Sequence, residues 1–265
     1  RDRTPTGFKR ISWDEALQFA AERLGEIRER FGPLSLARCG GAPVSYQGRD
    51  GFLEFMGAFG SPNVSGAANI CMVPRMTAFK AVTGEIRAEP DYDHTRLAVF
   101  WASDPLTSER FGSYAAYNGL RQIIPRLKEK GTKIVCIDPF RSKMAQQAHE
   151  WIRINPGGDS ALGLAMIHVI IRESLYDKAF VDAYTTGFEA LAEHVRSFTP
   201  EWAEPITGIP AKTIEDLARA YGTTKPAAIY EGNGLDMHAN GVDAVRTIAI
   251  LVGLTGNLDV AGGNV

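Results

Sequence analysis

Apolar residues recur along this chain with two different periods, one typical of helices and one typical of buried strands. Leu17, Ala20, Leu24, Ile27 and Phe31 follow one another at intervals of three or four residues, the spacing of one helix face. From residue 97 on, short and mainly apolar runs appear instead, as expected for strands that are covered on both faces. These runs are LAVFW (97–101), KIVCI (133–137), WIRIN (151–155) and AAIYE (227–231).

Helical segments separate these runs. The pattern predicts helices over about 114–130, from Asp159 as N-cap to about residue 173, and over about 241–254. A further helical stretch, interrupted by prolines, continues to about residue 222. Strands that alternate with helices indicate a mainly parallel, doubly wound sheet with helices on both faces, which is a three-layer αβα fold.

The opening part of the chain predicts a smaller unit. Ser12 and Glu15 form a capping box at the start of the first helix. A short strand is expected over 34–39, and a second helix, which carries Phe52, Phe55, Met56 and Phe59, is expected to end at Gly60. These elements are too few to close a sheet, so we expect a partial α/β domain.

Composition limits the class of partner and of metal site. The chain has 265 residues, 45% of them hydrophobic, and a net charge of −2, which gives no reason to expect nucleic acid or anionic membrane. Its apolar runs are shorter than the roughly 18–20 residues that span a bilayer. Three cysteines without a CxxC spacing argue against a disulfide framework and against a zinc or iron–sulfur site built by these residues alone.

Polar and glycine-rich loops follow all four predicted strands of the larger unit. They are Ser103-Asp104-Pro105, Asp138-Pro139-Phe140-Arg141, Pro156-Gly157-Gly158-Asp159 and Gly232-Asn233-Gly234. In doubly wound sheets, ligands bind at the carboxyl ends of the strands. Asp138 and Asp159 could accept hydrogen bonds from ribose or guanine, and Arg141 could pair with a diphosphate. Any one of these loops is equally well explained as turn chemistry.

Common nucleotide fingerprints are absent from the sequence. There is no GxGxxG after the first strand and no GxxxxGK[ST], so neither an ordinary NAD site nor a P-loop is supported. The five histidines form no HExxH-type ligand pair. Cys71 stands out instead, because it lies between a Gly/Ser/Asn-rich loop and a predicted helix, where it could offer one soft ligand to a metal. A buried structural cysteine is the alternative.

An ordered set of segments resembles one enzyme family across essentially the whole chain. The segments are RISWDEAL (10–17), FGSPN (59–63), Cys71 eight residues after Asn63, VFWASDP (99–105), IVCIDPFRSK (134–143), NPGGDSALGLAMIHVII (155–171), LYDKAFV (175–181), TGF (186–188), ITGIPAKTIEDLARAY (206–221) and LTGNLDVAGG (254–263). Their order and spacing resemble the large subunit of the molybdopterin oxidoreductases of the DMSO reductase family, in the branch of formate dehydrogenase, periplasmic nitrate reductase and acetylene hydratase.

The resemblance implies a bis(molybdopterin guanine dinucleotide) cofactor that holds molybdenum or tungsten, with Cys71 as the metal's thiolate ligand and catalytic residue. By position, three loops and Gly232 would bind the cofactor. The residues are Trp101, Ser103, Asp104, Pro105 and Ser108 in the first loop, Asp138, Pro139, Arg141 and Ser142 in the second, Gly157, Gly158 and Asp159 in the third, and Gly232 after the last strand.

The resemblance also implies a larger protein. Residues 1–66 would be part of the family's second domain and residues 67–265 its third, and a [4Fe–4S] cluster would belong to a preceding segment. An iron–sulfur electron-transfer subunit and a small-molecule substrate would be the partners, with no insertion in a membrane. Because the chain begins without methionine and stops at AGGNV, we expect a central fragment that is inactive alone and whose compartment stays open.

The sequence departs from the family pattern at several positions. Met72 stands where formate dehydrogenases have a histidine, which counts against formate oxidation. Phe140 replaces an expected basic residue, and Asp104 stands where an asparagine is common. The expected function is two-electron oxidation or reduction of a small substrate. A non-catalytic scaffold or electron-transfer subunit of a respiratory complex, and a non-redox hydratase of the acetylene hydratase type, are the alternatives.

Overall fold

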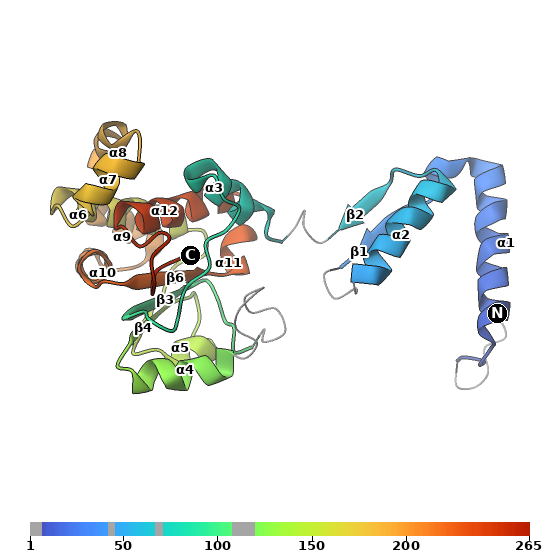
Figure 1. The fold of residues 1–265 in the computed structure, drawn as a ribbon, viewed down its shortest axis with the longest axis horizontal. Helices are drawn as coiled ribbons and strands as arrows, with labels where there is room; N and C mark the ends of the chain where they lie inside the picture. Colours follow the sequence, from blue (N-terminus) through green and yellow to red (C-terminus); the bar gives the residue numbers. More distant parts are fainter. Residues whose placement is uncertain (1–6, 42–45, 67–70, 108–119) are drawn as a thin grey trace. The chain divides into compact units, whose positions relative to one another are not determined.

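Each apolar run after residue 97 forms a strand in the computed structural model, which describes residues 7–41, 46–66, 71–107 and 120–265. The strands are β3 (Leu97–Trp101), β4 (Lys133–Ile137), β5 (Glu150–Ile152) and β6 (Ala227–Glu231). All are parallel, in the order β5-β4-β3-β6, and Figure 1 labels β4, β3 and β6 as neighbours. All five residues of β3 are buried because β3 has a strand on each side and helices above and below.

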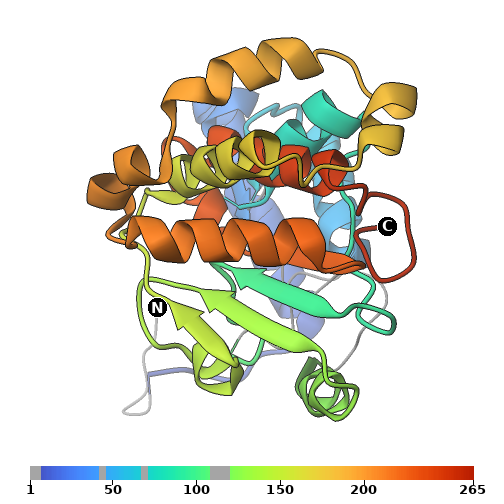
Figure 2. The ribbon, with the colours of Figure 1, turned by 90° about the vertical axis from the view of Figure 1, so that its left-hand side faces the viewer.

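Helices cover both faces of the sheet, and side chains of β3 alternate between the two layers. Leu97, Val99 and Trp101 pack into the larger core with α6 (Asp159–Arg172), α10 (Ala211–Thr223) and α12 (Gly241–Leu254). Ala98 and Phe100 pack into the smaller core with α4 (Leu120–Glu129) and α5 (Lys143–Gln147). Figure 2 shows the two layers on either side of the sheet. The predicted three-layer αβα fold with a mainly parallel sheet is confirmed.

The remaining helices of this part extend the larger layer. The helix α3 (Val73–Thr83) packs against α12, which also contacts α6 and α7 (Lys178–Tyr184). The chain then forms α8 (Phe188–His194), the 3₁₀ turn Val195–Ser197 and α9 (Pro200–Thr207), and α11 (Asn233–Asp236) follows β6 directly. Among the described residues, no helix has the length and apolar character that crossing a membrane requires.

Two asparagine side chains replace a neighbouring strand at the outer edge of β6. The Ile229 N–H group donates to Asn264 Oδ1 at 3.0 Å, and Asn264 Nδ2 donates back to the Ile229 carbonyl at 2.8 Å. The Ala227 N–H group donates to Asn257 Oδ1 at 3.1 Å. These three backbone groups of the edge are therefore satisfied although they are buried.

The chain divides into two compact units, Arg1–Asn69 and Ile70–Val265. The first contains α1 (Trp13–Phe31), the 3₁₀ turn Pro33–Ser35, β1 (Arg38–Gly40), α2 (Tyr46–Phe59) and β2 (Val64–Gly66), with β1 and β2 paired in parallel. Ser12 caps α1, because its hydroxyl accepts a hydrogen bond from the Glu15 N–H group at 3.1 Å. The second helix ends at Phe59, one residue before the predicted Gly60.

Several predicted boundaries differ from the structure. The strand expected over 34–39 begins only at Arg38, because Pro33–Ser35 form a 3₁₀ turn. The run at 151–155 forms a strand only over Glu150–Ile152, where it pairs with β4. The helix expected over 114–130 is described from Leu120, and its first part lies outside the described residues.

Candidate functional site

The carboxyl ends of β3, β4, β5 and β6 lie at the same edge of the sheet. The order in which the chain adds strands reverses at β3. The chain runs outward from β3 through β4 to β5, and then returns to place β6 on the other side of β3. The connections after β3 and β6 therefore lead to helices on opposite faces of the sheet, which makes this a topological switch point. In doubly wound folds, this is where a binding crevice opens.

The loop after β3 is tied to the loop after β4 through Asp104. Its carboxylate accepts hydrogen bonds from Thr107 Oγ1 at 2.6 Å and from the N–H groups of Lys143 and Met144 at 3.3 and 3.1 Å. Asp104 thus lies at the amino end of α5, where the helix favours negative charge. Ser103 and Pro105 are buried in this loop. Ser108 lies outside the described residues.

The loop after β4 forms a tight turn around a buried carboxylate. Asp138 Oδ1 accepts a hydrogen bond from the Phe140 N–H group at 3.0 Å, and Ser142 caps α5 by accepting from the Ala145 N–H group at 3.2 Å. Burial raises the pKa of Asp138, and the nearby Asp104 charge acts in the same direction. The side chain of Arg141 is exposed and Pro139 is half-buried.

The third loop corrects the predicted N-cap of α6, while the cofactor-binding role of Asp159 stays a prediction. The N-cap of α6 is Gly158, and Asp159 is the first helical residue. Its carboxylate turns toward β3 and accepts a hydrogen bond from Trp101 Nε1 at 2.7 Å. A buried indole N–H group needs an acceptor, and this requirement explains why Asp159 does not cap its own helix. Burial raises the pKa of Asp159, while the Trp101 hydrogen bond opposes that rise.

Glycines in these loops are required by close backbone contacts. Gly157 has a φ of 82°, in the left-handed region. A Cβ on Gly158 would lie 3.1 Å from Thr207 Cα, and a Cβ on Gly232 would lie 2.1 Å from the Ala102 carbonyl oxygen. The Gly232 N–H group also donates to the Trp101 carbonyl at 2.8 Å. Gly232 therefore lets the loops after β3 and β6 cross at the switch point.

Cys71 lies beside the end of β6. It is half-buried, two positions before the first residue of α3, and its Sγ accepts a hydrogen bond from Asn233 Nδ2 at 3.3 Å. Asn233 is the first residue of α11, two positions after the last residue of β6. In the structure, Cys71 therefore contacts the glycine-rich loop 232–234, although Cys71 and Asn233 are 162 positions apart in the sequence.

A buried charge network next to Cys71 was not predicted from the sequence. Arg75 donates to Asp236 Oδ2 through Nε at 2.8 Å and to the Glu231 carbonyl through Nη1 at 3.0 Å, and its N–H group donates to Asp236 Oδ1 at 2.9 Å. Burial raises the pKa of Glu231 to about 7, and the Arg75 charge opposes that rise. Arg75 follows Cys71 by four positions, but its partners lie more than 150 positions away, so no local pattern indicates them.

The described residues provide one cysteine sulfur at this edge rather than a complete metal site. Within them, no group of three or more His, Cys, Asp or Glu side chains could hold a metal ion. Cys39 is exposed and lies in the first unit, and Cys136 is buried in β4. A metal bound by Cys71 would therefore need further donors from outside the described residues.

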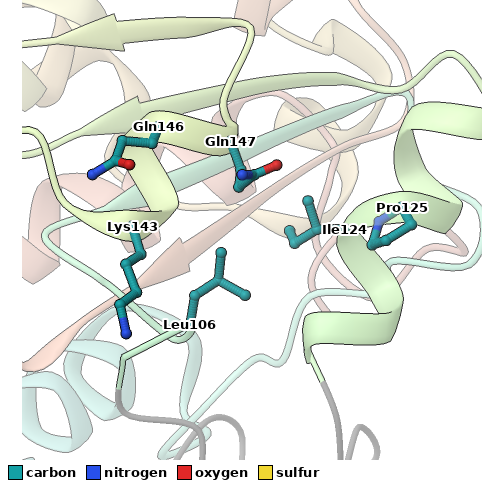
Figure 3. A pocket seen from close by; sticks show the side chains of 6 residues that line it. All are labelled: Leu106, Ile124, Pro125, Lys143, Gln146 and Gln147. Carbon is teal, nitrogen blue, oxygen red and sulfur yellow. The ribbon is translucent and has the colours of Figure 1, made fainter.

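Two pockets of about 370 Å³ each lie on the second unit, away from Cys71. The first lies between α4, α5 and the loop after β3, and Figure 3 shows its lining residues Leu106, Ile124, Pro125, Lys143, Gln146 and Gln147. The second is mainly apolar and lies among α3, α7, α8 and α12. Neither is lined by Cys71 or by the buried carboxylates of the strand-end loops.

Comparison with known proteins gives a consistent result over nearly the whole chain. Residues 3–265 match the family model described as molybdopterin oxidoreductase. The chain is 35% identical to the probable oxidoreductase YoaE of Bacillus subtilis over 97% of its own length and 37% of that protein's. It is 34% identical to formate dehydrogenase H of Escherichia coli, covering 94% of this chain and 34% of the relative.

Among solved structures, acetylene hydratase from Pelobacter acetylenicus has a similar fold. The TM-score is 0.77 and the identity 31%, over 97% of this chain and 34% of the hydratase. The chain thus spans about a third of the length of the relatives it matches.

Proposed function

The chain belongs to the molybdopterin oxidoreductases of the DMSO reductase family, and we propose that it forms the cofactor-binding central portion of an enzyme for two-electron redox chemistry of a small substrate. The cofactor would be bis(molybdopterin guanine dinucleotide) with molybdenum or tungsten. Cys71 would be the metal's thiolate ligand.

The position of Cys71 is the observation that supports this proposal most. Its sulfur lies 3.3 Å from Asn233 Nδ2, beside the end of β6 and next to the switch point between β3 and β6. The donor set fits the group, because one thiolate from the protein complements a cofactor that brings sulfur donors of its own. Soft sulfur ligands suit metals of this kind. When bound, the metal and its dithiolenes supply the two-electron chemistry.

The strand-end loops would supply contacts to the guanine dinucleotides of the cofactor, and a further domain outside these residues would complete the second pterin site. We assign this role to residues 101–108, to 138–142, and to Gly157, Gly158 and Asp159, with Gly232 at the crossing of the loops. The exposed Arg141 side chain is available to pair with a diphosphate. Asp104 serves chiefly to join two of these loops, since three hydrogen bonds already reach its carboxylate.

The rest of the enzyme would lie outside these residues. We assign residues 1–66 to part of the family's second domain and residues 67–265 to its third. A [4Fe–4S] cluster would belong to the preceding domain, and electrons would pass to an iron–sulfur subunit. A scaffold function and a hydratase function are the alternative hypotheses, and each predicts a different experimental outcome.

The test is to determine metal and nucleotide in the full-length protein, purified anaerobically. Mass spectrometry gives molybdenum and tungsten, and acid hydrolysis releases GMP. We expect about two GMP per metal in the wild type, as two guanine dinucleotides require, and we expect Cys71→Ala to lose metal or activity. Cys39→Ala is the matched control, because Cys39 is exposed in the other unit, and it should retain both.

The competing functions predict other results. A folded wild-type protein without metal and without GMP would contradict the enzyme and favour a scaffold. Metal and GMP together with hydration of an alkyne, but no electron transfer to dyes over a substrate panel, would favour a hydratase.

A further inference from the structure

The side-chain amide of Asn233 lies between a buried arginine and the sulfur of Cys71. Asn233 Oδ1 accepts a hydrogen bond from Arg75 Nη2 at 2.7 Å. On the other side of the same amide, Nδ2 donates to Cys71 Sγ at 3.3 Å. One planar group therefore connects the guanidinium of α3 with the cysteine that precedes this helix.

The chemistry of arginine determines which end of the amide faces the sulfur. A guanidinium has only donors, so it can bind the amide through its oxygen but not through its NH₂ group. With Oδ1 held by Arg75, the NH₂ group of Asn233 must point away from the guanidinium, toward Cys71. The direction of the N–H···S hydrogen bond is thus set by Arg75.

Arg75 itself has little freedom to move. Its Nε and Nη1 groups donate to Asp236 and to the Glu231 carbonyl, and its own N–H group donates to Asp236. Its exposed fraction is only 9%. Because the guanidinium is fixed by several partners on α11 and at the end of β6, it can hold the amide in one orientation.

We propose that Arg75 and Asn233 are positioning residues for Cys71: Arg75 orients the Asn233 amide, whose N–H group then directs the cysteine sulfur and stabilises negative charge on it. The role at a metal rests on the function proposed above. The hydrogen bond itself does not, so it can be tested without cofactor. A hydrogen bond to a charged atom is stronger than one between neutral groups, and this contact should therefore affect the sulfur's reactivity.

The first test measures alkylation of Cys71 in cofactor-free full-length protein. Iodoacetamide is applied at one fixed pH, and peptide mass spectrometry follows Cys71 and Cys39 in the same sample. Asn233→Asp keeps an acceptor for Arg75 but has no donor for the sulfur, and Asn233→Leu removes both in a neutral side chain. Thermal unfolding checks that each variant is folded.

We expect both variants to slow alkylation of Cys71 relative to Cys39 by about three- to fivefold. Without the N–H donor, the sulfur loses the group that directs it and stabilises its charge, while its higher intrinsic nucleophilicity offsets part of this effect. Arg75→Lys should slow the reaction by less, because lysine lacks the fork that fixes the amide. An unchanged ratio of Cys71 to Cys39 in folded Asp and Leu variants would overturn the proposal.

A second measurement uses the metal-loaded enzyme. If Cys71 is the ligand, Asn233→Leu should make its sulfur more electron-donating and lower the reduction potential of the metal, with metal content unchanged. Slower alkylation with an unchanged potential would overturn the role at the metal and leave the hydrogen bond established. Slower alkylation in a protein that never holds metal would instead contradict the proposed function.

Discussion

At the scale of single residues, several charged side chains are buried together at the end of β6. Glu231 is the last residue of the strand and lies 3.9 Å from Arg75 Nη1. Arg75, Arg87 and Asp236 all act on its carboxyl, the two arginines lowering its pKa and Asp236 raising it, but burial is the largest influence and raises that pKa to about 7. Ionisation of Glu231 therefore works against the folded state.

This environment predicts a pH-dependent stability that Glu231→Gln removes. The ordinary carboxyl pKa is 4.5 and the folded value is about 7, so the folded protein binds the proton more tightly than the unfolded chain. The unfolding free energy should then decrease as pH rises between these values, by up to about 3 kcal/mol from this residue. Urea unfolding of both proteins at several pH values measures the difference.

The quantity to follow with pH is the difference in unfolding free energy between wild type and Glu231→Gln, because other carboxyl groups titrate equally in both proteins. A constant difference between wild type and Glu231→Gln from about pH 5 to pH 8 would show that the buried carboxyl does not titrate there.

At the scale of elements, the crossing of the loops after β3 and β6 explains the glycine-rich segment. Ala102 has a φ of 51°, an uncommon conformation for a residue with a Cβ. Gly232 passes so close to it that a Cβ would lie 2.1 Å from the Ala102 carbonyl oxygen and 2.6 Å from Ser103 Cα. The crossing holds the two loops of the switch point in place.

Gly232→Ala should therefore destabilise the fold by about 3 kcal/mol, since backbone atoms cannot move aside as a flexible side chain can. Gly253→Ala is the matched control. Gly253 lies in α12, and a Cβ there would meet nothing within 4 Å. That change should be neutral or stabilise the helix by up to about 1 kcal/mol. Thermal unfolding separates the two, and equal melting temperatures would argue against the crossing as a structural requirement.

At the scale of the whole molecule, short apolar runs that alternate with helical segments determined the sheet and its layers, so the αβα fold could be predicted. β3, β4 and β6 match the predicted ranges residue for residue, because each run is bounded by polar residues or turns. The bounds of the strand at 150–152 and the hydrogen bond of Asp159 could not be predicted this way. Both depend on contacts with β4 and Trp101, which are distant in sequence.

The candidate site also contains some residues that could be predicted from the sequence and others that could not. The strand-end loops and Cys71 are visible as local patterns, whereas Arg75, Asn233 and Asp236 meet only in the folded chain, with Arg75 and Asp236 161 positions apart. A charge network between residues so far apart produces no periodic pattern in the sequence. The structure was needed to connect Cys71 with the end of β6.

X-ray absorption at the metal edge of the full-length enzyme tests the central claim, that Cys71 binds the metal, most directly. It counts the sulfur neighbours of molybdenum or tungsten in the wild type, in Cys71→Ser and in the control Cys39→Ser. We expect Cys71→Ser to lose one sulfur neighbour, with an oxygen neighbour in its place, and the control to match the wild type. The same number of sulfur neighbours in all three proteins would show that Cys71 is not a ligand.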